Sequence, residues 1–155
     1  GDSAGAHLAA LLGLLPSCAG SEADGPHPEQ PFNAQAVVGI STPADFLHMG
    51  TRPLSTWALF RGPSETLELR AEAASPLRHV REGAPPFLLV HAKDDSLIPF
   101  ETQGKALAEA LQRLPGCEVR LLAFEEGGHS VLSRYHLEIR TAMEEFLARA
   151  LARRK

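Results

Sequence analysis

A serine, a carboxylate and a histidine occur in the chain in positions where together they could carry out nucleophilic catalysis. Gly1-Asp2-Ser3-Ala4-Gly5 matches the pattern G-x-S-x-G, and a helix-forming segment follows at once. This pattern places a serine on a tight strand-to-helix turn, with two glycines relieving the crowding there. The hydroxyl then lies at a helix N-terminus, which favours negative charge, so the Ala4 N–H is a candidate oxyanion donor. The alternative is a helix start at which Ser3 only caps the helix.

A serine nucleophile needs a base, and the base needs an acid that orients it. Candidate acids lie in His91-Ala-Lys-Asp-Asp-Ser-Leu-Ile-Pro99, directly after the clearest predicted strand. The candidate base, His129, follows Gly127-Gly128 in a turn after the next predicted strand. In open α/β sheets ligands gather at the carboxyl ends of the strands, so we expect these side chains at the same edge.

The segments that would position these residues alternate between helix and strand. The patterning predicts helices over 4–15, 65–74, 101–114 and 131–152, and strands over 36–41, 86–91 and 118–124. The run Pro86–His91 is continuously apolar, which is typical of a parallel strand buried on both faces. Ser64 is the expected N-cap of the helix over 65–74. The alternation predicts an α/β fold with a mainly parallel sheet flanked by helices, and an irregular, partly helical excursion at about 43–84.

Composition excludes several other classes of protein. The chain has 155 residues, a formal net charge of −4 and 44% hydrophobic residues, which fits one globular domain and lacks the basic patch of a nucleic-acid binder. No apolar run approaches the roughly 18 residues of a membrane span. Two cysteines are too few for a disulfide framework, and the compartment stays open. The histidines outside the motifs lack metal-ligand spacing, so no metal is expected.

Three motifs in register resemble those of α/β-hydrolase esterases. Gly1–Ala9 resembles the nucleophile elbow of groups akin to hormone-sensitive lipase, of feruloyl-esterase-like carboxylesterases and of kynurenine formamidase. Ala74–Leu77 and Pro85–His91 look like the approach to their acid, and His91-x-x-x-Asp95-x-x-Ile98-Pro99 is similar to H-G-x-x-D-x-x-V-P. The resemblance runs from residue 1 to about residue 150.

The resemblance implies an α/β-hydrolase fold and a catalytic triad of Ser3, Asp95 and His129, in the chain order of that fold. The histidine-to-acid spacing selects Asp95 over Asp94, which is then a loop charge or turn former. It also implies a small ester substrate, an acyl-enzyme intermediate and no cofactor. The residues themselves favour a small local core around Trp57 and Phe60, whereas the resemblance implies that these two side chains line the substrate pocket.

The sequence departs from the family in one large respect. The family's His-Gly-Gly loop, which would supply the remaining oxyanion N–H groups, is absent from residues 1–155. A smaller departure is Ala92, which stands where the family usually has a glycine after the histidine. We therefore expect residues 1–155 to be the C-terminal portion of a single catalytic domain, without its N-terminal strands, and we expect this portion to be inactive alone. Two alternatives stay open: an arylformamidase or prolyl-oligopeptidase-like peptidase with the same triad, and a non-catalytic esterase-like fragment or binding module.

Overall fold

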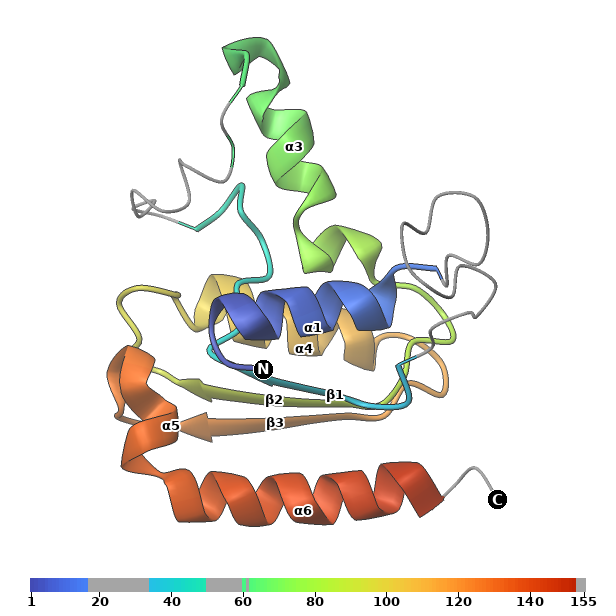
Figure 1. The fold of residues 1–155 in the computed structure, drawn as a ribbon, viewed down its shortest axis with the longest axis vertical. Coiled ribbons are helices and arrows are strands. Elements are labelled where there is room, and N and C mark those ends of the chain that lie inside the picture. Colours follow the sequence, from blue (N-terminus) through green and yellow to red (C-terminus); the bar gives the residue numbers. More distant parts are fainter. Residues whose placement is uncertain (17–33, 50–59, 61, 153–155) are drawn as a thin grey trace, which may run out of the picture.

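The computed structural model describes residues 1–16, 34–49, 60 and 62–152, and its centre is a parallel sheet (Figure 1). The strands are β1 (Val37–Ile40), β2 (Phe87–Ala92) and β3 (Val119–Phe124), in the order β1-β2-β3. Residues 1–2 extend the sheet beyond β1, because Asp2 bridges Ile40 in parallel and the Ile40 N–H donates to the Gly1 carbonyl at 3.0 Å. All three predicted strands are therefore confirmed.

Helices cover both faces of this sheet. On one face lie α1 (Ala4–Leu14) and α4 (Ala106–Gln112), and on the other lies α6 (His136–Ala152) (Figure 1). The side chains of β2 alternate between the two cores: Phe87 and Leu89 pack towards α1 and α4, whereas Leu88 and Val90 pack towards α6. Every residue of β2 is buried, as its continuous apolar run predicts.

The excursion packs with Ile98 of the loop after β2 in a small apolar cluster, and α3 (Leu67–Ala73) projects away from the sheet (Figure 1). The cluster consists of Phe46, Met49, Phe60, Ala71 and Ile98. The buried amide of Gln103 anchors the start of the excursion, because its Oε1 accepts the N–H groups of Ala44 and Asp45, each at 2.8 Å. This anchor ties the excursion to the segment that leads into α4.

The predicted N-cap at Ser64 is wrong. A 3₁₀ turn over Ser64–Thr66 precedes α3, so Ser64 lies inside a turn whose capping position belongs to Pro63. The Thr66 hydroxyl donates to the Pro63 carbonyl at 3.2 Å, and no side chain caps α3 itself.

The predicted helix over 131–152 is two helices. A short α5 (Val131–Arg134) is followed directly by α6, and Tyr135 between them has φ −121° and ψ 36°. The Tyr135 ring stacks on Phe124 at the end of β3, with centroids 4.2 Å apart and the planes 15° from parallel. We attribute the break to this tertiary contact, because it fixes the Tyr135 ring at the end of β3. Figure 1 shows α5 near the carboxyl ends of the strands.

Candidate active site

The turn at Ser3 has the backbone geometry of a sharp strand-to-helix elbow. Ser3 has φ 51° and ψ −118°, a left-handed conformation that is uncommon outside glycine. Its N–H donates to the Ile40 carbonyl at 2.8 Å, which fixes the turn against β1. A Cβ on Gly1 would lie 2.3 Å from the Gly5 carbonyl group, so the turn requires glycine at position 1. A Cβ on Gly5 meets no described atom within 4 Å, so this second glycine relieves no such contact.

The hydroxyl of Ser3 does not cap α1, which removes the support for the capping alternative. Its Oγ lies 2.9 Å from His129 Nε2, and His129 Nδ1 lies 3.0 Å from Asp95 Oδ2. Because an ionised carboxylate only accepts, Nδ1–H donates to Asp95, and neutral Nε2 is left to accept the Ser3 hydroxyl proton. The structure thus brings the three predicted side chains into one hydrogen-bonded chain.

Asp95 is held by donors on both carboxylate oxygens. Its Oδ1 accepts the N–H groups of Leu97 and Ile98, each at 2.9 Å, while Oδ2 faces His129 and also lies 3.5 Å from His91 Nε2. Burial alone would raise the pKa of this carboxyl group, but the bonds from His91, Ile98 and His129 outweigh it and hold the pKa well below its ordinary range. The carboxylate is therefore ionised throughout the neutral pH range.

The neighbouring Asp94 contacts the histidine loop in a different way. Its carboxylate is exposed and accepts the backbone N–H of Gly128 at 2.7 Å and that of Gly127 at 3.3 Å. The sequence predicts only a loop charge or turn former at Asp94, and it does not predict this contact. Asp94 and the Gly127-Gly128 turn are adjacent only after folding, so the sequence carries no local signal for this contact.

His91 is a second residue whose contacts sequence reasoning did not anticipate. It is buried in β2, and its Nε2 donates to the Ile98 carbonyl at 2.8 Å. This bond closes the loop that carries Asp95, and the same nitrogen faces the Asp95 carboxylate.

The remaining site predictions have different outcomes. Ala4 is the first residue of α1, so its N–H has no carbonyl four residues earlier within the helix and is open to a ligand. Phe60 is 6% exposed and packs edge-to-face on Phe46, as the local-core alternative expects. Trp57 lies outside the described residues, and its place beside a pocket stays a prediction.

In the described part of the chain, no three His, Cys, Asp or Glu residues are grouped to hold a metal ion. Within the same residues, no helix is long and apolar enough to span a membrane.

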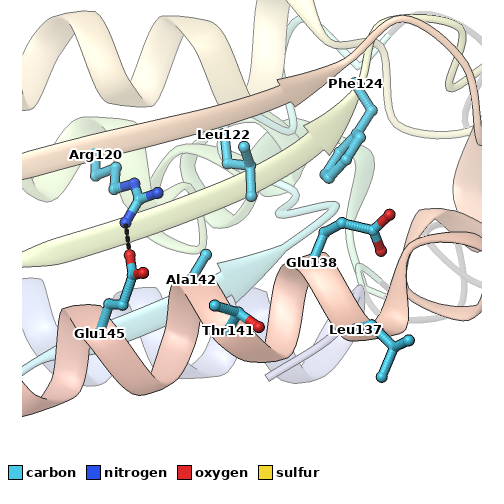
Figure 2. Close-up of a pocket in the computed structure, with 8 residues that line it drawn as sticks. All are labelled: Arg120, Leu122, Phe124, Leu137, Glu138, Thr141, Ala142 and Glu145. Carbon is cyan, nitrogen blue, oxygen red and sulfur yellow. Dashed lines mark hydrogen bonds and ion pairs between the residues drawn. The ribbon is translucent and has the colours of Figure 1, made fainter.

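A groove of about 540 Å³ lies away from the triad, between β3 and α6 (Figure 2). Leu122 and Phe124 point from the strand towards the helix, and an ion pair between Arg120 and Glu145 closes one end at 3.3 Å. None of Ser3, Asp95 and His129 lines this groove. It therefore does not form part of the site described above.

Comparisons with solved structures agree with the fold. An acetyl ester-xyloside bifunctional hydrolase from Caldicellulosiruptor lactoaceticus superposes with a TM-score of 0.76 and 26% identity, over 96% of this chain and 54% of that one. Native esterase Est2 of Thermogutta terrifontis superposes with a TM-score of 0.72 and 28% identity, over 96% and 53%. The chain has the α/β-hydrolase fold of these enzymes.

The family assignment is narrower than the fold. Residues 1–111 match the BD-FAE family model, so the chain belongs to the BD-FAE family. Esterase LipC of Mycobacterium tuberculosis is 32% identical over 135 residues, which are 83% of this chain and 33% of LipC. The chain spans about a third of the length of the curated relatives it matches.

Proposed function

We propose that this protein is a serine hydrolase that cleaves carboxylic esters. The observation that carries the proposal is the hydrogen-bonded chain from Ser3 through His129 to Asp95, with 2.9 and 3.0 Å between its members. The named esterases among its relatives support the ester bond over the formamide or peptide bond that similar triads cleave.

In the acylation step, Ser3 Oγ attacks the acyl carbon of the ester while its proton passes to His129 Nε2. The Ala4 N–H donates to the oxyanion of the tetrahedral intermediate. His129 then gives the proton to the departing alcohol oxygen, and the C–O bond to that oxygen breaks. Asp95 stays ionised, holds Nδ1 protonated and stabilises the imidazolium that forms.

In the deacylation step, a water molecule attacks the acyl-enzyme and gives its proton to His129. Collapse of the second tetrahedral intermediate returns that proton to Ser3 Oγ and releases the carboxylic acid. Both steps use the same three side chains, so loss of any one of them slows both.

The test compares the full-length protein with its Ser3→Ala variant on short p-nitrophenyl esters. We expect ester hydrolysis to fall by about 10³-fold or more, and labelling by a fluorophosphonate probe to disappear. Ser64→Ala, which removes an exposed hydroxyl from the 3₁₀ turn, is the matched control and should keep both. Undiminished hydrolysis in Ser3→Ala would refute the proposal, and absence of labelling in the wild type would favour a binding module.

A matched pair of aryl substrates separates the ester from the amide alternative. We expect aryl acetates to be cleaved with a higher kcat/KM than aryl formamides. If aryl formamides were cleaved with the higher kcat/KM, and if Ser3→Ala abolished that cleavage, the protein would be a formamidase with the same triad.

A further inference from the structure

Two adjacent carboxylates hold the same loop by different groups. Asp95 accepts the side-chain Nδ1–H of His129 at 3.0 Å, and Asp94 accepts the backbone N–H groups of Gly127 and Gly128 at 3.3 and 2.7 Å. The loop that presents the imidazole to Ser3 is therefore bonded to the acid loop both at His129 and at the two residues before it.

The Gly127-Gly128 turn has a backbone conformation that a hydrogen-bonding partner would stabilise. Gly127 has φ 140° and Gly128 has φ 55°, and two glycines in sequence lose more conformational entropy on folding than other residues. Successive N–H groups in this kind of turn form a concavity that binds anions. The Asp94 carboxylate of the neighbouring loop occupies it here. The two acidic residues just before the glycines pair with side chains instead: Glu125 with Lys93 and Glu126 with Arg134.

We propose that Asp94 is a positioning residue, which holds the Gly127-Gly128 turn so that His129 Nε2 stays within hydrogen-bond distance of Ser3 Oγ. This inference rests on the proposed function, because it assigns Asp94 a part in the same reaction. Asp94 touches neither the ester nor the reacting atoms, so it acts only through the placement of His129.

Loss of Asp94 should impair turnover more than substrate binding. Displacement of a catalytic group by about 1 Å can cost on the order of 10² in rate. Because Asp94 is exposed and water can replace part of its bonding, we expect a smaller effect, on the order of a tenfold fall in kcat with KM within about twofold. A purely structural role would instead lower the folded fraction and leave kcat per active site unchanged.

The experiment uses the full-length protein, with active sites counted by fluorophosphonate titration, and compares Asp94→Ala, Asp94→Asn and Glu125→Ala. Asp94→Asn keeps one carbonyl oxygen that can accept the shorter bond from Gly128, so it should recover most of the turnover. Glu125→Ala removes a charge from the same turn without touching its backbone hydrogen bonds and should leave kcat unchanged. Hydrogen exchange measured on the peptide that covers residues 125–130 should accelerate in Asp94→Ala alone.

An unchanged kcat per active site in Asp94→Ala, or an equal loss in Glu125→Ala, would overturn the proposal. Failure of the proposed function looks different, since the wild type itself would then hydrolyse no ester. In that event hydrogen exchange decides whether Asp94 holds the turn: faster exchange in Asp94→Ala supports the inference, and unchanged exchange overturns it.

Discussion

Gly104 packs directly against the imidazole of His91, so closely that a Cβ at position 104 would lie 2.3 Å from Nδ1. Gly104 belongs to a π-helical turn, Glu101–Lys105, that leads into α4. The close approach keeps the ring oriented with Nε2 towards the Ile98 carbonyl and the Asp95 carboxylate. A residue without a side chain thus supports the acid of the triad through a buried histidine.

The first prediction concerns this contact. Gly104→Ala should displace either the imidazole or the turn and destabilise the protein by about 1–3 kcal/mol, as overpacking of a core does. Because the displaced ring faces Asp95, kcat should fall as well, which esterase assays on titrated active sites would measure. Gly116→Ala is the control: its φ of 73° is strained for alanine, but the new Cβ meets no described atom within 4 Å. It should cost about 1 kcal/mol without changing kcat.

The second prediction separates the two glycines before His129. A Cβ on Gly127 would lie 3.2 Å from the Val131 backbone, at a φ of 140° that L residues rarely adopt, whereas Gly128 has open space and a φ of 55°. Gly127→Ala should therefore destabilise the protein more than Gly128→Ala, which should cost about 1–2 kcal/mol. Urea unfolding of the two variants measures this difference. Equal losses would mean that the contact with Val131 relaxes freely.

Most helices and strands of this fold can be predicted from local patterns, because the apolar residues that each element buries lie close together in the sequence. A strand buried on both faces gives a continuous apolar run, as in β2. A helix buried on one face gives apolar residues at the helical period, as in α6. The break at Tyr135 does not follow from the sequence, because it depends on a ring from β3. The sequence predicts a cap at Ser64 because it does not reveal the 3₁₀ turn ahead of α3.

The candidate site divides in the same way. Ser3, Asp95 and His129 could be predicted because each lies in a motif with a fixed local context, and the spacing from His91 selects one of two acids. The contacts of Asp94 with the glycine turn join loops more than 30 residues apart. No local pattern encodes such a contact, so only the folded chain reveals it.

The third prediction is a change in acid stability on substitution of Asp95. In the folded chain the pKa of this carboxyl group lies below its unfolded value of about 4. The stabilisation it provides is therefore present above about pH 4 and is lost as the pH falls towards the lower folded pKa. Asp95→Asn should flatten the dependence of unfolding free energy on pH below pH 4, as measured by urea unfolding at pH 6 and pH 3. The same steep loss in both proteins would contradict the prediction.

The fourth prediction concerns His7, which links α1 to the end of α3. Its Nε2 donates to the Ala74 carbonyl at 2.7 Å, and its ring packs edge-to-face on Phe46 at 5.0 Å. Burial lowers the pKa of this imidazole, and the bond to Ala74 opposes that shift only in part. The unfolded chain therefore binds a proton more readily, so stability is highest above the unfolded pKa of about 6.5 and falls on acidification.

His7→Ala tests this coupling at two pH values. At pH 8 the variant should be less stable than the wild type by about 1–3 kcal/mol, because the Ala74 carbonyl loses its donor. At pH 5.5 the gap should narrow, because the wild type then bears the cost of protonating a buried imidazole. Urea unfolding measures both gaps, and His136→Ala, at an exposed position, serves as the control substitution. A gap that widens on acidification would mean that the charged form of His7 is the one the fold favours.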